Sequence, residues 1–403
     1  YKTQETMQGA ADSAAISAAV GLNGGNTNAA LQAGAAAAAA SYGFVNGQSG
    51  ATVTVNNPPR LPQAGTYVGN QGAVEVIIKQ PQKLLFSALF LKSPVVVQGY
   101  AVAVAGAGIP CVLALNPSLL VPGITAQLGS AVLADQCNVA DNSPSPLALT
   151  VDSGSSITAQ KVNVVGGYVN ILGTVTTTQG IHTGVLPPTA DPYAGTTVDA
   201  SFKSLPCDPN SFSPTTSITH TITGTVTLSP GRYCGGILVG AGANVTLSPG
   251  TYYMDGNLLS GALKGGLTVA TGGSLTGTGV TIVLTTSGPL SSLLNLDLGG
   301  LYSGGVINLT APSSGPYAGL VLFADPGATL AILSLRGGTQ NNLVGTIYAP
   351  SSTVTYLLSS GTKTGQCTRL IAGVIDFALG SGSYSKCAVT LGPTSAAPAS
   401  LVE

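Results

Sequence analysis

Carboxylates that could carry acid-base chemistry are few and scattered in this sequence. The 403 residues include 14 Asp and Glu, and the aspartates between positions 135 and 376 form no Asp-x-Asp motif or other close pair. Glycosidases need two carboxyl groups at a fixed separation, which scattered acids reach only through folding. A polysaccharide lyase would also need a basic proton acceptor, for which the sequence offers Lys161, Lys203, Arg232 and Lys264. Because no basic groove is indicated, we expect no catalytic site, and a carbohydrate-active enzyme is kept as an alternative.

Metal and nucleotide sites are not indicated either. The two histidines, His182 and His220, have no metal-ligand spacing to each other or to a cysteine. The G-x-S-x-G elbow, the P-loop and G-x-G-x-x-G are absent in spite of 55 glycines, which are better explained as turn residues with positive φ. We therefore expect no cofactor and no metal.

The six cysteines favour disulfides over a metal site. Their number is even, they fall into three neighbouring pairs and no C-x-x-C occurs, which predicts an oxidising compartment; buried free thiols are the alternative. Sequence neighbours lie close together in a stacked β structure. We therefore predict the pairs Cys111 with Cys137, Cys207 with Cys234, and Cys367 with Cys387.

The composition excludes some partners and favours others. Only 7% of the residues are charged and the net charge is −1, so the chain cannot assemble a basic face for nucleic acid. With 44% hydrophobic residues the chain is expected to fold. Few charges on a large surface favour self-association, so we expect the protein to contact other copies of itself. No run reads as a membrane span, and any export signal before Tyr1 is expected to have been removed or not included.

Residues 1–120 are predicted to form two helices and a small α/β unit. The first helix runs from about Met7 to Val20 and the second from about 28 to 40. Strands are expected at 51–55, 73–78 and 95–104, with a short helix at 84–91, and the run 111–115 closes the unit.

The rest of the chain, residues 121–403, reads as short β runs separated by turn residues. The segment 226–233, VTLSPGRY, returns at 245–252 as VTLSPGTY, a spacing of 19 residues (245 − 226). A period near 20 with turn residues at each end is typical of one coil of a parallel β-solenoid. The predicted fold is therefore mainly β, a β-solenoid with a short C-terminal tail, preceded by the helical α/β unit.

The two predicted helices are rich in alanine, and small side chains let another backbone approach closely. We interpret one face of these helices as a candidate contact between subunits; the alternative is that both helices pack on their own α/β unit. The candidate contact residues are Met7, Ala11, Ala14, Ala15, Leu31, Ala35 and Ala38.

The opening segment 8–15, QGAADSAA, resembles the region that follows the membrane helix in TadE/TadG-like proteins of the bacterial tight-adherence (Flp) pilus system. Tyr42-Gly43-Phe44, Val74-Glu75-Val76, the strand 111–115 and Asp191-Pro192-Tyr193-Ala194 look like further landmarks. The membrane helix of that family is missing here. The resemblance implies a protein cut after that helix and released, so that the membrane is a partner only through a removed N-terminal segment.

The later half resembles a different group. The two repeats at 228–233 and 247–252, with Gly277 to Ile282 and Gly345 to Pro350, look like the β-solenoid of bacterial ice-binding-like and adhesin proteins. Many members of that group are surface proteins, so this resemblance bears on the fold more than on a ligand.

Together these features predict a secreted, extracellular, non-catalytic protein of the bacterial cell surface, a structural subunit that polymerises head to tail into a filament or surface layer and contacts host or abiotic surfaces. The first alternative is a surface adhesin or an ice- or carbohydrate-binding solenoid. Against ice binding, the threonines form local runs in the sequence, such as 176–178, and no sustained Thr-x-Thr ladder.

Overall fold

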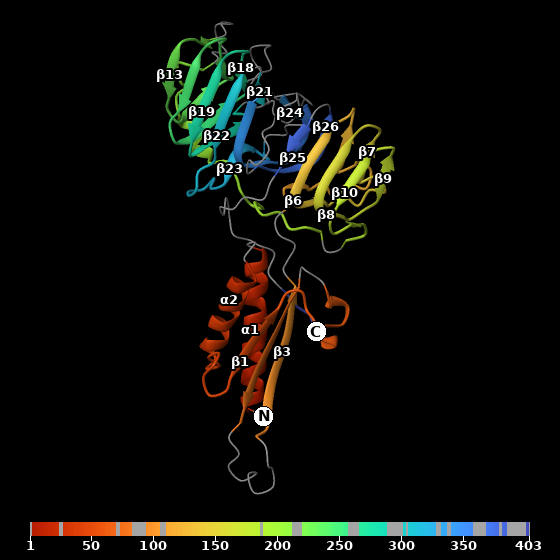
Figure 1. Ribbon diagram of the computed structural model, residues 1–403. Helices are drawn as coiled ribbons and strands as arrows, with labels where there is room; N and C mark the ends of the chain where they lie inside the picture. Colours follow the sequence, from red (N-terminus) through yellow and green to blue (C-terminus); the bar gives the residue numbers. More distant parts are fainter. Residues whose placement is uncertain are drawn as a thin grey trace. The chain divides into compact units, whose positions relative to one another are not determined.

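The chain divides into two compact units, and its described residues are mainly β, with two α-helices. The computed structural model describes residues 2–23, 27–69, 73–82, 94–104, 110–185, 188–211, 220–256, 266–287, 301–303, 305–327, 332–336, 340–357, 368–378, 381–384 and 400–402. The first unit comprises Tyr1–Ile109 with Ser395–Glu403, and the second Pro110–Thr394 (Figure 1).

The first unit packs two helices on an antiparallel sheet. Its elements are α1 (Lys2–Asn23), α2 (Asn28–Ser41), β1 (Thr52–Asn56), a 3₁₀ helix (Pro62–Tyr67), β2 (Ala73–Pro81), β3 (Val96–Val104) and β28 (Ser400–Val402). The sheet order is β1-β2-β3-β28. Alanine favours helix and leaves room for a close neighbour, and α1 lies against α2, β2 and β3. A Cβ on Gly99 of β3 would overlap the backbone of Met7, so glycine permits this close approach.

The second unit is built from parallel strands that pair in three rows. Row 1 contains, in order, β12 (Thr221–Ile222), β15 (Gly236–Val239), β18 (Gly266–Val269), β21 (Leu301–Ser303), β24 (Ile332–Arg336), residues 353–357 of β25 (Gln340–Leu357), residues 374–378 of β26 (Thr368–Ala378), β5 (Ile124–Gln127), β7 (Leu149–Asp152) and β9 (Tyr168–Ile171).

Row 2 is described in two sections. The first holds β13 (Thr225–Leu228), β16 (Asn244–Leu247), β19 (Ser274–Thr278), β22 (Val306–Thr310) and residues 340–344 of β25. The second holds β27 (Ser381–Ser383), residues 131–134 of β6 (Ala131–Asp141), residues 156–159 of β8 (Ser156–Val164) and β10 (Thr174–Thr177).

Row 3 is continuous and lies partly under a 3₁₀ helix (Ala200–Ser204). It contains β14 (Gly231–Cys234), β17 (Gly250–Asp255), β20 (Val280–Thr285), β23 (Leu320–Ala324), residues 345–349 of β25, residues 368–372 of β26, β4 (Val112–Ala114), the ends of β6 and β8, and β11 (Ile181–His182).

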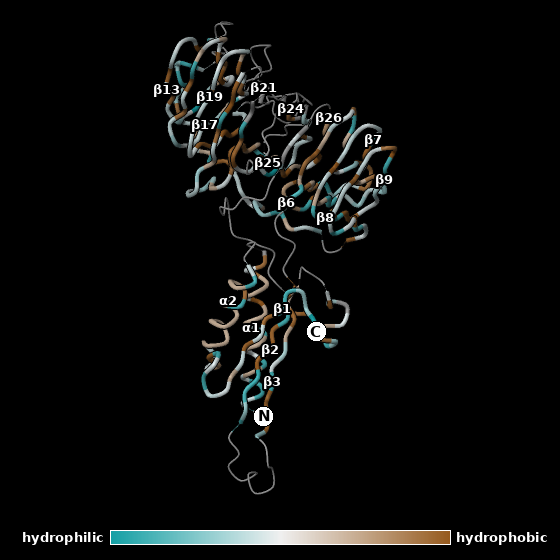
Figure 2. The backbone as a smooth tube through the Cα atoms, viewed as in Figure 1, coloured by the Kyte–Doolittle hydropathy of each residue, from teal (hydrophilic) through white to brown (hydrophobic). Residues whose placement is uncertain are grey.

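The repeat seen in the sequence is a true structural register. Val226 of β13 pairs with Val245 of β16, which pairs with Leu275 of β19 and, through it, Ile307 of β22. In β16 and β22 buried and more exposed residues alternate, so each strand turns one side to the core. Figure 2 shows apolar and polar residues interspersed along the strands of the second unit. The stacked apolar positions form one continuous core.

The order of strands in space differs from their order in the sequence. β26, near the end of the unit, pairs with β4 and β5 at its start. The strands from β4 to β11 therefore continue the stack that runs from β12 to β26. The intervening segment, residues 188–205, returns along the outside of row 3, where Tyr193 and Val198 pack with Tyr348 and Phe323. This cover explains why β20 and β23 are buried on both faces.

Two predicted boundaries need correction. The second unit begins at Pro110, not at 121, because residues 111–115 pair with β26 and β6 and not with the first unit. The C-terminal tail is not part of the β stack, since β28 adds to the edge of β3. The helix predicted at 84–91 falls outside the described residues.

Candidate functional site

The helix residues predicted to contact other subunits lie in the core of the first unit. Side chains of Met7, Ala11, Ala14, Ala15, Leu31 and Ala35 are 0–1% exposed, and Ala38 is half-buried against the same core. They pack with Val74, Val76 and Ile78 of β2, which is the alternative that the sequence left open. A contact with another subunit through α1 or α2 would have to use other residues of these helices.

Two of the three predicted disulfides are present. Cys111 is bonded to Cys137 and Cys207 to Cys234. The first joins neighbouring turns of the stack, and the second ties the returning segment to β14. The predicted pair Cys367 with Cys387 lies outside the described residues.

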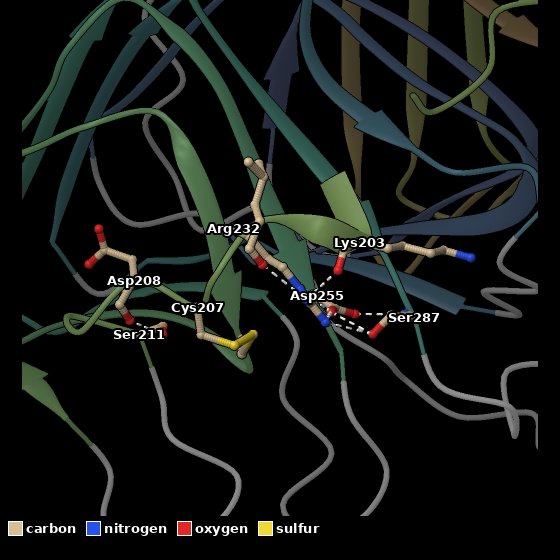
Figure 3. The surroundings of a disulfide bond; sticks show 9 residues. Lys203, Cys207, Asp208, Ser211, Arg232, Asp255 and Ser287 are labelled. Carbon is tan, nitrogen blue, oxygen red and sulfur yellow. Dashed lines mark hydrogen bonds and ion pairs between the residues drawn. A yellow bond between two sulfur atoms is a disulfide. The ribbon is translucent and has the colours of Figure 1, made fainter. Parts of the chain in front are cut away.

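Arg232, one of the candidate bases, is held in an ion pair beside the Cys207–Cys234 disulfide (Figure 3). Its Nη2 lies 2.6 Å from Oδ2 of Asp255, which is 1% exposed. Nη1 donates to the carbonyls of Lys203 (2.9 Å) and Leu205 (3.1 Å), and Nη2 also donates to Ser287 Oγ (3.0 Å). The guanidinium thus fastens the returning segment to the stack, which is a structural task for this candidate base.

A buried carboxylate also organises the first unit. Glu75 of β2 is 0% exposed and accepts hydrogen bonds from Asn56 Nδ2 (2.6 Å), the Tyr100 hydroxyl (3.0 Å) and the backbone N–H groups of Leu61 (3.1 Å) and Arg60 (3.3 Å). Burial, followed by the adjacent Glu75 carboxylate, raises the pKa of Tyr100. Glu75 therefore pins the segment before the 3₁₀ helix to the sheet.

Asp141, at the end of β6, is the most unusual acid of the second unit. Its side chain is 1% exposed; Oδ1 accepts from the N–H of Ser143 (2.8 Å), whereas Oδ2 accepts no hydrogen bond from the described residues. Burial raises its pKa to about 7, although the N–H groups of Ser143 and Ile124 counteract this in part. A Cβ at Gly123 would overlap the carboxylate, so the Asp141 side chain packs closely against this glycine.

Three further acids of the second unit accept hydrogen bonds from hydroxyl groups of other strands or segments. Asp191 accepts from the Tyr348 hydroxyl (2.8 Å), Asp325 from Thr285 (2.7 Å) and Asp376 from Thr125 (2.7 Å). No three His, Cys, Asp or Glu side chains of the described residues cluster in a way that could hold a metal. Of the histidines, His182 is exposed, with Nε2 3.0 Å from the carbonyl of Gln179, and His220 is exposed as well.

The outward side of row 2 forms a surface that the sequence did not predict. Most of its partly or fully exposed side chains are short, polar and uncharged, with the apolar Val306 and Leu133 as exceptions. We call this surface the polar face; it consists of Thr225, Thr227, Asn244, Thr246, Ser274, Thr276 and Asn308 in one section, and Ser156, Thr158, Thr174 and Thr176 in the other. In register, Thr227, Thr246, Thr276 and Asn308 form one column, and Thr246 Oγ1 lies 3.5 Å from Thr276 Oγ1. In the sequence, the sign of this face is the Thr-x-Thr pattern within single strands. The column across several strands becomes apparent only when the register is known.

Among the helices that the structure describes, none is long and apolar enough to cross a membrane. Comparison with known proteins finds no matching family, no similar curated protein and no similar solved structure.

Proposed function

We propose that this protein is a non-catalytic structural subunit of a secreted, extracellular bacterial filament or surface assembly, related to TadE/TadG-like proteins, whose second unit is a parallel β-solenoid. The observation that carries the proposal is the stack of parallel strands in three rows around one apolar core, with few charged residues on its described outer positions. Such a stack suits a building element, because its cross-section repeats along its length.

The path of the chain supports the solenoid assignment. From β12 to β14 and again from β15 to β17 the chain passes through rows 1, 2 and 3 in that order, and each turn lies in register on the next. The same order recurs in the section from β5 to β11.

Two features support a location outside the cell. The Cys111–Cys137 and Cys207–Cys234 disulfides indicate a non-reducing compartment. A low charge on an extended surface favours contacts with other copies of the chain, which are the proposed partners together with host or abiotic surfaces.

Electron microscopy of the purified full chain tests the proposal. Ordered fibres or sheets at micromolar concentration are expected, and fractionation of cells that produce the protein should place it outside the membrane. Dispersed monomers at every concentration and salt tested would contradict the structural role.

The polar face favours a second candidate, a surface-binding module of the adhesin, ice- or carbohydrate-binding kind. A flat, uncharged array of hydroxyl and amide groups can meet a regular solid or polysaccharide surface. Thr246→Tyr and Thr276→Tyr would disturb the array, whereas Thr268→Tyr in row 1 would not. Loss of binding to ice or to insoluble polysaccharide in the first two variants alone would support this candidate.

A further inference from the structure

We propose that a second copy of the chain docks end to end on the second unit, with β10 of one copy pairing in parallel with β13 of the next. The inference rests on the proposed function, since it takes the stack to be a solenoid that self-assembles, and it names the surface that does so. In the part of the chain that the structure describes, the two ends of the stack are the turn β9-β10-β11 and the turn β12-β13-β14.

The two ends have the same sense of winding. Each terminal turn passes through rows 1, 2 and 3 in that order. In both sections of the stack, from β12 to β26 and from β4 to β11, the residue numbers increase toward the β9-β10-β11 end. If the β9-β10-β11 end of one copy meets the β12-β13-β14 end of another, every strand direction continues. The contact is heterologous and leaves a free end on each copy, which generates a filament.

The facing strands match in sequence. β10 reads Thr174-Val175-Thr176-Thr177 and β13 reads Thr225-Val226-Thr227-Leu228. Among the described residues, β10 pairs only with β8, and β13 only with β16. In the alignment of Val175 with Val226, the outward threonines of both strands extend the two columns of the polar face.

The directions in which the backbone N–H and C=O groups of the two strands point allow this alignment. The N–H of Thr174 donates to Ser155 (2.9 Å) within the stack, so the backbone groups of Val175 point to the free edge. At the other end the N–H of Asn244 donates to Gly224 (2.8 Å), so Thr225 and Thr227 point to the free edge and Val226 does not. In a parallel pair a residue that bonds the neighbouring strand lies opposite one that does not. Val175 opposite Val226 satisfies this rule.

The inward-facing side chains of β10 and β13 are less buried than those of the interior strands. In the interior turns Val132, Ile157, Val245 and Leu275 are 0–1% exposed, whereas Val175 and Val226 are only half-buried on the same core. Docking would place the two valines in contact. Ile171, the last residue of β9, and Leu172, which follows it, are 54% and 85% exposed and add apolar surface to that end.

Among the described residues, rows 1 and 2 have at neither end the devices that usually protect free strands. Strands β9 to β13 contain no Lys, Arg, Asp, Glu or Pro, which are the residues that blunt edges in monomeric proteins. Row 3 is the exception, because the backbone of Cys207 forms an isolated parallel β-bridge with Arg232 on the outer side of β14. The docking contact therefore uses rows 1 and 2.

Two proline variants test the contact. Val175→Pro removes an N–H that points to the free edge of β10, and Thr227→Pro does the same on β13, so neither breaks a bond within the stack, and proline is tolerated in edge strands. Each purified full-length variant should melt close to the unaltered protein and sediment as a monomer. An equimolar mixture of the two variants should give a species of twice the monomer mass and nothing longer. The intact β10 of Thr227→Pro can pair with the intact β13 of Val175→Pro, and both remaining ends of this dimer carry a proline. Thr246→Lys, an outward position of an interior turn, should assemble like the unaltered protein.

The outcomes separate this inference from the proposed function. If the unaltered protein forms fibres and the proline variants form them equally well, or if their mixture stays monomeric, the end-to-end contact is wrong while the structural role stands. If Thr246→Lys alone abolishes the fibres, the polar face carries assembly and the contact is again wrong. If the unaltered protein stays monomeric, both are wrong.

Discussion

Thr125 of β5 donates a hydrogen bond of 2.7 Å to Asp376 of β26, across 251 residues of sequence. Gln127 donates to the same oxygen at 2.7 Å. These bonds lie where the strands at the start of the second unit meet those near its end. The Asp376 carboxylate thus adds side-chain hydrogen bonds to the strand pairing that joins the two sections of the stack.

We expect Asp376→Ala to destabilise the second unit by about 1–3 kcal/mol, because it leaves the Thr125 hydroxyl and the Gln127 amide without their acceptor in a partly buried place. Asp376→Asn keeps one oxygen acceptor and should cost less. Thermal unfolding of both variants checks this. Equal melting temperatures for the alanine variant and the unaltered protein would show that the joint does not depend on these bonds.

The pairing of β26 with β4 and β5 could not be predicted from the sequence, whereas the local repeat could. Val226 and Val245 lie in nearly identical segments, so their pairing is visible in the residues themselves. The next inward positions follow at spacings of 30 (275 − 245) and 32 (307 − 275) residues, because the intervening turns differ in length. Because the spacing varies, no regular period is visible in the sequence, and the outward residues that form the polar face cannot be aligned from it.

Helix composition was similarly ambiguous. Alanines at positions such as 11, 14 and 35 suit a close contact with any partner, and nothing in the sequence distinguishes a neighbouring subunit from the sheet of the same chain. The structure buries them on β2 and β3. The disulfides Cys111–Cys137 and Cys207–Cys234 were predictable because both join neighbouring turns or segments, which are close in space in a stacked fold.

The stacked core predicts a strong contrast between two substitutions by aspartate. Val245 is 1% exposed between Val226 and Leu275, so Val245→Asp would bury an unpaired charge and cost several kcal/mol. Ser313 is exposed, and Ser313→Asp should change stability by less than about 0.5 kcal/mol. Chemical denaturation measures both, and small equal shifts would argue against the register.

Removal of the Cys207–Cys234 disulfide should destabilise the second unit by roughly 3.5 kcal/mol, as the chain-entropy treatment gives for a loop of this length. The double variant Cys207→Ser, Cys234→Ser would be compared with the unaltered protein by thermal unfolding. Peptide mapping without reductant should recover this pair, Cys111 with Cys137, and the predicted Cys367 with Cys387. Any other pairing of the last two cysteines would refute that third prediction.

In the first unit, Glu75→Gln should cost about 1–3 kcal/mol. Oε1 and Oε2 of Glu75 both act only as acceptors, and an amide would turn one of them into a donor that faces other donors such as Asn56 Nδ2 or the N–H of Leu61. Limited proteolysis after the substitution should cut first near the 3₁₀ helix that Glu75 holds. Glu5→Gln, at an exposed position of α1, is the matched control and should leave the cleavage pattern unchanged.

Asp141 makes the stability of the second unit depend on pH in a direction unusual for a carboxylate. Its pKa is about 7 in the folded protein and near 3.8 in an unfolded chain, so between these values the folded state binds more protons than the unfolded state. Stability should therefore fall as the pH rises from about 4 to about 7, by up to about 4 kcal/mol from this group, and then level off.

Asp141→Asn isolates this effect, because the amide oxygen can still accept from the N–H of Ser143 while the side chain never ionises. The difference in unfolding free energy between the variant and the unaltered protein should be small at pH 4 and should grow in favour of the variant up to pH 7, whatever the other acids contribute. Asp152→Asn, at a half-exposed position of β7, controls for the loss of one negative charge. A difference that stays constant with pH, or grows toward low pH, would mean that Asp141 is ionised in the folded protein and that an unseen partner stabilises its charge.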